Sequence, residues 1–399
     1  MKFSVMAWSK GGARAGVLQV GSCSIDTPAL LINTRKGLPA FISPDLLSSL
    51  PTPDSRLLQF SPFHFSEGIS MKTISDLGGL HQMIGLHDHV FSAVPRDPIL
   101  SIPNYQSSNT LGASFETPYG RLLINPQKYM EMIFALKPNM WATLADEVPS
   151  WVTEKRNRAS VDRTLRWLDD CLKSSFANNT GEAVFGTIVG GSKIEERKRC
   201  AQEVSKRKVS GFCLGGFGLG ECMDERPSIL SAITEILPDD KPRQICGLGL
   251  PEEVLQGVAA GVDLFDSTYI YHLTLGGFAL TFPLEEIGRH GNDYQLCDTT
   301  GGDSTKINLK ATIYRKDTSP IIEGCKCYTC QNHTKAYINH LFNVHEMLAQ
   351  ILLEIHNTHH YIGFFHAIRE AIKGGTFEEF CRNFVEKRRD HILTVALNA

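Results

Sequence analysis

Short apolar runs alternate with stretches of helical pattern along the chain from about residue 138. Each run ends in polar residues or glycine and is brief enough to be a buried strand; the runs are 140–145, 183–189, 211–214, 245–250 and 262–265. Between them, apolar positions recur at spacings of three and four, for example at Val161, Leu165, Leu168 and Leu172. Five such alternations predict a parallel sheet, either a closed (β/α)8 TIM barrel or an open doubly wound sheet.

The carboxyl ends of these predicted strands carry polar residues and glycines. Asp146 and Glu147 follow the first strand, glycine pairs follow the second and third, and Asp266 follows the fifth. Because the carboxyl ends of the strands form the active face of a barrel, we expect the candidate site there.

A second candidate site is a cluster of metal-ligand residues near the C-terminus. Cys325, Cys327 and Cys330 form a C-x-C-x2-C motif, and His356 follows at the end of a helix predicted over 334–355. Three thiolates and one imidazole fill the tetrahedral shell of Zn²⁺, which leaves no position for water, so the sequence predicts one structural Zn²⁺ per chain. His333 and His360 are alternative fourth ligands, and the other interpretation is three unliganded thiols on a loop.

These patterns predict a barrel core over residues 1–310, with less regular strands around 17–20 and 28–32. A zinc-binding subdomain over 311–365 is appended to it, and a helical segment over 366–399 completes the barrel.

Composition narrows the class of protein. The 399 residues are 42% hydrophobic and 21% charged, which is typical of a globular protein. A formal charge of −3 argues against a protein that coats nucleic acid, so any RNA contact is local or shared with a partner. Eleven scattered cysteines favour a reducing compartment. No apolar run is long enough to span a membrane, and the acid-free first 25 residues only faintly suggest a transit peptide.

The cysteine motif and several other segments resemble one known family. The stretch 324–330 followed by His356 is similar to the signature of the tRNA-guanine transglycosylases, the queuine tRNA-ribosyltransferase family, which exchange guanine at the tRNA wobble position for queuine or its precursors. Further similar segments follow in the family's order: 13–18, 26–29, 78–81, 146–147, 185–191, 211–221, 241–243 and 261–266.

The resemblance implies a (β/α)8 barrel with a zinc subdomain and a double-displacement reaction. One aspartate attacks C1′ of the ribose, and a second acts as acid and base. Asp266 stands at the position of the nucleophile, and Asp146 matches a base-recognition aspartate.

Three positions depart from the family's pattern. Ile102 stands where the proton-handling aspartate belongs, and an isoleucine cannot carry a proton. Val189 replaces a glutamine that reads the base edge. Segment 269–277 has no Arg or Lys where the family has phosphate-binding arginines.

These losses indicate a non-catalytic member, in which no catalytic residue is expected and Asp266 is vestigial. Eukaryotic enzymes of the family pair a catalytic subunit with such an accessory paralogue. We therefore expect a heterodimer with the catalytic subunit, a homodimer as a second assembly, and tRNA bound through the complex. The resemblance also implies a cytoplasmic protein that associates peripherally, if at all, with the mitochondrial outer membrane.

Two other functions stay open. The chain would be an active transglycosylase if Asp266 were the nucleophile and Glu116 or Asp97 the acid; more remotely, it would bind queuine without RNA. If the chain is not catalytic, Asp266 is an inherited strand-end carboxylate bound to backbone amides.

The basic clusters 197–199, 206–208 and 387–389 are either phosphate contacts or solvated helix faces.

Overall fold

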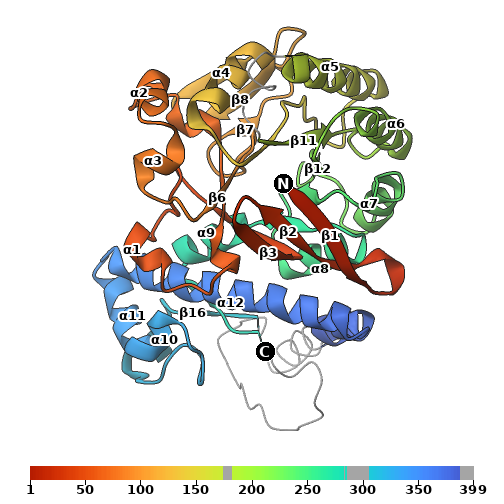
Figure 1. Ribbon diagram of the computed structural model, residues 1–399. Coiled ribbons are helices and arrows are strands. Elements are labelled where there is room, and N and C mark those ends of the chain that lie inside the picture. The colour runs from red at the N-terminus through yellow and green to blue at the C-terminus, as the bar shows by residue number, and fades with distance from the viewer. Residues whose placement is uncertain (174–181, 283, 285–304, 387–399) are drawn as a thin grey trace. The chain divides into compact units, whose positions relative to one another are not determined.

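The computed structural model describes residues 1–173, 182–282, 284 and 305–386. Its centre is a closed barrel of eight parallel strands, so the TIM barrel is confirmed and the open sheet is wrong (Figure 1). Around the barrel the strands are β10 (Met140–Ala142), β11 (Ala183–Ile188), β12 (Gly211–Leu214), β13 (Arg243–Ile245), β14 (Leu264–Asp266), β4 (Ala29–Asn33), β5 (Leu57–Phe60) and β6 (Val90–Ala93).

The five runs predicted as strands all contribute to this barrel, but one of these strands ends earlier than predicted. Residues 246–250, predicted as part of a strand, form the turn after β13. Gly247 has a φ of 89° there, which takes the chain out of the extended conformation.

The chain contains two compact units, and the barrel lies entirely in the first. Unit 1 comprises residues 1–38 and 56–268, and unit 2 comprises 39–55 and 269–399. The domain boundaries proposed at residues 310 and 365 stay a prediction.

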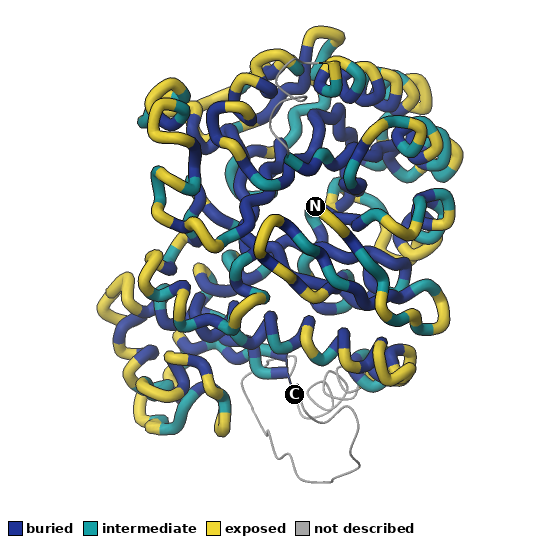
Figure 2. Tube along the Cα trace, viewed as in Figure 1, coloured by how far each residue is buried: buried dark blue, intermediate teal, exposed yellow. Residues whose placement is uncertain are grey.

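Helices of unit 1 lie outside the strands, and the longer ones, such as α4, α5 and α6, have a buried inner face and an exposed outer face (Figure 2). They are η1 (Lys10–Gly12), η3 (Pro62–Phe65), α2 (Met71–Asp76), α3 (Leu80–Ile84), α4 (Pro126–Leu136), α5 (Glu154–Lys173), α6 (Ile194–Ser205), α7 (Arg226–Thr234) and α8 (Pro251–Ala259). The predicted apolar stripe of α5 is buried at Val161, Leu165 and Leu168.

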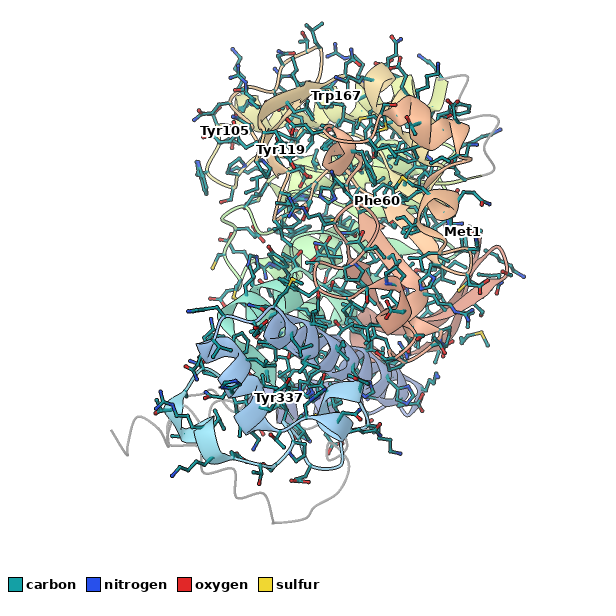
Figure 3. The ribbon with its side chains drawn as sticks, turned by 90° about the vertical axis from the view of Figure 1, so that its left-hand side faces the viewer. Met1, Phe60, Tyr105, Tyr119, Trp167 and Tyr337 are labelled. Carbon is teal, nitrogen blue, oxygen red and sulfur yellow. The ribbon has the colours of Figure 1, made fainter. Side chains whose placement is uncertain are left out.

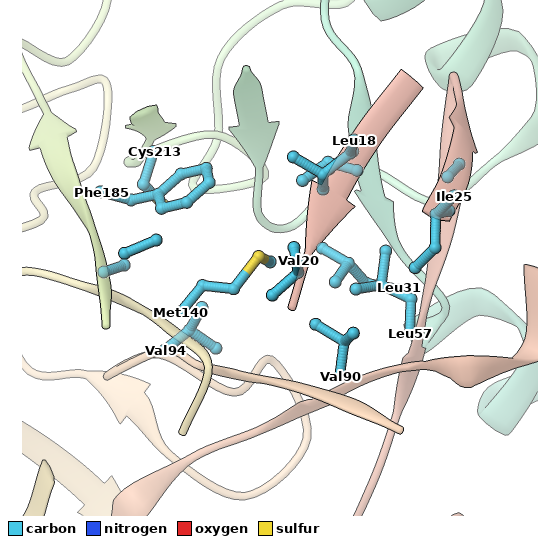
Figure 4. Close-up of a cluster of buried hydrophobic side chains, with 14 of the residues drawn as sticks. Leu18, Val20, Ile25, Leu31, Leu57, Val90, Val94, Met140, Phe185 and Cys213 are labelled. Carbon is cyan, nitrogen blue, oxygen red and sulfur yellow. The ribbon is translucent and has the colours of Figure 1, made fainter. Parts of the chain in front are cut away.

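A small antiparallel sheet covers the amino ends of the barrel strands. It consists of β1 (Lys2–Trp8), β2 (Arg14–Val20) and β3 (Cys23–Thr27). Leu18 and Ile25 of this sheet belong to the same buried cluster as Leu57, Val90 and Met140, which begin barrel strands (Figure 4). This core closes one end of the barrel, so a site in the barrel can open only at the other end, which we call the barrel mouth.

A third sheet in unit 1 carries the passage that departs from the family's pattern at Ile102. Strands β7 (Ile102–Pro103), β8 (Ala113–Thr117) and β9 (Gly120–Ile124) are antiparallel. They lie in the chain between β6 and α4, where a barrel has a connection from strand to helix.

In its described residues, unit 2 contains helices and one short sheet. Its elements are α1 (Pro44–Leu47), η2 (Asp54–Arg56, whose last residue belongs to unit 1), α9 (Thr268–Gly276, whose first residue belongs to unit 1), the antiparallel pair β15 (Phe278–Leu280) and β16 (Lys306–Asn308), η4 (Thr312–Lys316), α10 (Tyr328–Asn332), α11 (Lys335–Asn343) and α12 (Leu348–Lys373). No helix in the described ranges is both long and apolar enough to cross a membrane.

The single helix predicted over 334–355 is wrong, because it is two helices. α11 ends at Asn343, and α12 begins at Leu348. His345 between them has a φ of 60°, which cannot continue a right-handed helix. Within this range Leu341 and Leu352 are buried, whereas Val344, just after α11, is 49% exposed.

Candidate functional site

The four predicted metal ligands come together in unit 2. The ligand atoms of Cys325, Cys327, Cys330 and His356 all lie within 4.8 Å of one another. Nδ1 of His356 is 3.5 Å from Sγ of Cys327 and 3.4 Å from Sγ of Cys330. Zn–S and Zn–N bonds of ordinary length in a tetrahedron imply an S···N separation of about 3.5 Å. The group can therefore hold a metal ion, and its geometry is compatible with zinc.

Surrounding contacts orient these ligands. Nε2 of His356 lies 2.9 Å from the carbonyl oxygen of Leu280, which makes Nε2 the protonated nitrogen and leaves Nδ1 free for a metal. Cys327 caps α10, because its Sγ accepts from the backbone N–H of Cys330 at 3.3 Å. Among the described residues, neither alternative ligand joins the group: His360 stacks on His356, and His333 stacks on Tyr337.

Asp266, in unit 1, ends β14 at the barrel mouth. Its Oδ2 accepts from the backbone N–H of Gly247 at 2.7 Å, and its Oδ1 accepts from that of Thr268 at 3.1 Å. The side chain is fully buried, and burial raises its pKa above the ordinary value for an aspartate. Both oxygens thus serve to hold the backbone at the ends of two strands.

Arg96 lies across the barrel mouth. It follows β6, which stands opposite β13 in the eight-stranded order. Its Nη1 donates to Oε2 of Glu147 at 2.9 Å and to the carbonyl of Phe217, behind β12, at 2.7 Å. Its Nη2 is so close to Gly247, behind β13, that a Cβ there would lie 2.7 Å from it. The guanidinium therefore reaches from one side of the mouth to the other.

Asp146, which follows β10, is held by two arginines of α5. Arg156 binds both carboxylate oxygens, with Nη1 2.7 Å from Oδ2 and Nη2 2.8 Å from Oδ1. Arg163 adds a bond of 3.0 Å to Oδ2. The same arginines donate to the carbonyls of Tyr105 at 2.8 Å and Ser108 at 3.1 Å, so they fasten the segment between β7 and β8 above the buried carboxylate.

Comparison with known proteins decides the family. The sequence model described as Queuine tRNA-ribosyltransferase matches residues 9–390. The chain belongs to the queuine tRNA-ribosyltransferase family. It is 35% identical to the Xenopus tropicalis protein named Queuine tRNA-ribosyltransferase accessory subunit 2, over 94% of this chain and 97% of that protein. The human and Danio rerio proteins of the same name are 34% and 33% identical, over 91% and 95% of this chain and 94% and 97% of theirs.

The positions at which this chain departs from the family's pattern lie in three different places. Ile102 pairs with Glu116 in the β7–β8 sheet, and its side chain is 48% exposed. Val189 is buried behind β11. Segment 269–277 lies in and just after α9, in unit 2. Ile102 and Val189 cannot transfer a proton, and segment 269–277 contains no Arg or Lys to pair with a phosphate.

The two acids considered as substitutes have different environments. Glu116 is exposed and accepts from the side-chain amide of Asn104. Asp97 is buried, and its Oδ2 lies 2.8 Å from Nε2 of His64. Burial alone would raise the pKa of Asp97, but the hydrogen bond and charge of His64, aided by the backbone of Ile99, outweigh burial and lower this pKa.

The cavity beside His64 is small. This cavity, between the turn after β4 and the tip of the β8–β9 hairpin, has a volume of about 10 Å³, which holds at most one water molecule. Its lining includes Arg35, Lys36, Phe63, His64, Leu100 and Tyr119. Tyr105 and Tyr119 lie toward the same edge of unit 1 (Figure 3). A purine does not fit this cavity.

Most basic residues of the two described clusters have internal partners. Arg197 is buried against the carbonyls of Gly191 and Gly215. Arg199, Lys206 and Arg207 form ion pairs with Glu196, Glu203 and Asp169, respectively. Arg197 is therefore not on a solvated helix face, and residues 206–208 follow the end of α6. The third cluster, 387–389, lies outside the described residues.

Sequence reasoning missed Arg96, Arg156 and His64. Arg96 is the first charged residue after the apolar run 90–94, and that position at a strand end was a usable signal. Arg156 and His64 carried no such signal, because their partners are set by the folded chain.

Proposed function

We propose that this chain is the non-catalytic accessory subunit of a queuine tRNA-ribosyltransferase complex. The complex would exchange guanine for queuine at the wobble position of tRNAs with GUN anticodons, those for Asp, Asn, His and Tyr. The observation that carries the proposal is the burial of Asp266, both of whose carboxylate oxygens bind backbone amides, with Arg96 reaching across the barrel mouth.

A nucleophilic carboxylate must reach the ribose carbon, and a nearby group must move a proton. Both oxygens of Asp266 accept backbone hydrogen bonds, and Ile102 has no proton to move. Asp97 is a poor replacement, because an acid catalyst must hold its proton near neutral pH and its pKa is lowered.

The chain's part in the complex would be assembly and tRNA support. We infer one structural Zn²⁺ on Cys325, Cys327, Cys330 and His356, which would hold α10 and α12 together for contact with the catalytic subunit. Homodimers are the second assembly that the family resemblance allows. The complex would be cytoplasmic, with any association with the mitochondrial outer membrane being peripheral.

A second candidate function is a transglycosylase that is active alone, with Asp266 as nucleophile. The retained carboxylate of Asp266 at the end of β14 favours this candidate. Asp97 would have to supply the acid; it is linked to this strand end through Asn33, which lies 3.4 Å from Oδ1 of Asp97 and 3.5 Å from Oγ1 of Thr268.

The test is incorporation of labelled guanine into a wobble-guanine tRNA by the zinc-loaded chain, alone and mixed with a catalytic paralogue. We expect activity only in the mixture, and we expect that activity to survive Asp266→Asn in this chain. Incorporation by the chain alone, abolished by Asp266→Asn, would establish the second candidate instead.

A further inference from the structure

Two cations and an exposed aromatic ring border the cavity beside His64, in unit 1. Arg35 and Lys36 lie in the turn after β4, at the barrel mouth, and Tyr119 lies at the tip of the β8–β9 hairpin. None of the residues that line the cavity is acidic. We call the surface formed by Arg35, Lys36 and Tyr119 around this cavity the cationic hollow. Its charge is opposite in sign to the formal charge of −3 of the whole chain.

The two cations of the hollow are not neutralised by carboxylates. In the described part of the chain, neither Arg35 nor Lys36 forms an ion pair with an acidic side chain. Nζ of Lys36 donates to the backbone carbonyl of Glu67 at 3.2 Å, a contact that leaves its charge in place. Asp97 lies behind His64, because its Oδ2 is 2.8 Å from Nε2 of that histidine and its side chain is buried. Both cations can therefore bind an anion from outside.

The turn that carries the cations is ordered by its own backbone. The N–H of Arg35 donates to the carbonyl of Leu38 at 2.7 Å, and the N–H of Leu38 donates to the carbonyl of Arg35 at 3.4 Å. Within the turn, Lys36 has a φ of 56° and Gly37 a φ of 91°. Lysine adopts this left-handed conformation less readily than glycine or asparagine does, yet a lysine stands there. An ordered turn also loses less entropy when its side chains bind a ligand.

Tyr119 offers a flat apolar surface next to these cations. The residue is 51% exposed and lies toward the edge of unit 1 (Figure 3). Thr117 orders the hairpin tip, because its Oγ1 donates to the carbonyl of Gly120 at 2.8 Å and accepts from the N–H of Tyr119 at 3.3 Å. No other ring of the described residues stacks on Tyr119. An exposed aromatic ring of this kind is a surface on which a nucleobase can stack.

The size of the cavity restricts how an anion can bind. Its volume of about 10 Å³ is too small for a phosphate group, so the anion must lie over the opening. A nucleotide unit of RNA suits this arrangement, because it joins a phosphate to a flat base, and the hollow places two cations beside a flat ring. A free phosphate ion would leave Tyr119 without a contact.

We propose that Arg35, Lys36 and Tyr119 form an RNA-binding surface, in which the two cations hold a backbone phosphate and the tyrosine stacks on an unpaired base. The inference rests on the proposed function, which brings tRNA to the complex, and it names the surface of this chain that contacts the RNA. The turn after β4 thus supplies the phosphate-binding cations that segment 269–277 does not contain.

Fluorescence anisotropy with a short labelled oligouridylate tests the surface on the full, metal-loaded chain without a partner. The wild type should bind this unstructured RNA with an affinity that falls as the salt concentration rises. Arg35→Glu combined with Lys36→Glu should lower the affinity at least roughly tenfold, because two phosphate contacts are lost. The slope of log affinity against log salt should also become shallower by about 1.4, since each contact to a single strand contributes about 0.7.

The matched control combines Lys206→Glu with Lys208→Glu. It changes the net charge by the same amount at two exposed lysines that precede β12, on the side of the barrel covered by the small antiparallel sheet, and it should bind as the wild type does. Tyr119→Ala should weaken binding at least about fivefold without changing the salt slope, because it removes stacking and not charge. Tyr119→Phe keeps the ring and should restore the affinity.

The proposal is overturned if the wild type does not bind the RNA, or if the control loses as much affinity as the Arg35 and Lys36 variant. It is also overturned if Tyr119→Ala binds as the wild type does, because the hollow would then be a site for a bare anion. If the Arg35→Glu and Lys36→Glu chain does not fold, Arg35→Gln with Lys36→Gln replaces it and must make the slope shallower in the same way. Failure of the proposed function is a separate result: the chain would exchange guanine alone, whatever residues hold the oligouridylate.

Discussion

At the scale of single residues, the buried charged groups of the barrel mouth are satisfied by the chain itself. Asp266 binds two backbone amides, Asp146 binds two arginines, and Arg96 binds Glu147. An active site instead keeps some charged groups free for a substrate. In this chain the partners of these strand-end charged groups are already in place.

The buried ion pair between Arg96 and Glu147 should contribute to stability. Arg96→Ala should lower the free energy of unfolding by about 3–5 kcal/mol, because it leaves the buried carboxylate of Glu147 without its cation. Urea unfolding followed by circular dichroism measures this loss. Lys206→Ala is the control: it removes an exposed partner of Glu203 and should cost less than about 1 kcal/mol. If Arg96→Ala and Lys206→Ala lowered the free energy of unfolding equally, the Arg96–Glu147 ion pair would not stabilise the barrel mouth.

At the scale of elements, the cysteine cluster connects parts of unit 2 that are far apart in the sequence. Cys327 and Cys330 lie at the start of α10 and within it, His356 lies in α12, and the histidine contacts Leu280 in β15. Leu352, Leu353 and Tyr314 form the apolar cluster next to the cysteines. A bound metal would therefore fix the positions of two helices and a strand.

Metal removal tests this connection. Elemental analysis should find about one zinc per chain, and a chelator or Cys327→Ser should release it and disturb the packing around Tyr314, as seen in the near-ultraviolet circular dichroism. Cys222→Ser, which changes an exposed cysteine, should leave both metal content and spectrum unchanged. A Cys327→Ser variant that retained the full metal content would exclude Cys327 as a ligand.

At the scale of the whole molecule, unit 2 exposes apolar residues near the break between α11 and α12. Val344 is 49% exposed, Met347 65% and Leu348 37%. Apolar groups that gather at one surface favour contact with another protein. This surface adjoins α12, which the proposed function places at the contact with the catalytic subunit.

Met347→Glu should therefore weaken binding to the catalytic subunit by tenfold or more, because a charge would be buried in an apolar contact. Light scattering after gel filtration of the mixture, with titration for affinity, measures the change. Met6→Glu changes a methionine that is 70% exposed in unit 1 and should have no effect. If both variants bind normally, the contact lies elsewhere.

The sequence by itself determined the features that depend on local order. The spacing of apolar residues, together with the polar residues and glycines that follow each apolar run, predicted the five strands from β10 to β14 and the helices between them. The spacing of the cysteines predicted the metal ligands. These signals are local because backbone hydrogen bonding and side-chain direction repeat over a few residues. The same locality explains the error over 334–355, where an apolar stripe continued past a residue with positive φ.

Only the tertiary structure decided how the barrel mouth is filled. Barrel closure brings Arg96, after β6, to the loops behind β12 and β13, and it brings the carbonyls of 105 and 108 to the arginines of α5. No spacing in the chain encodes these contacts, because they depend on which strands face each other after closure. The sequence therefore showed at which positions the chain departs from the family's pattern, and the fold showed which contacts surround the residues at the barrel mouth.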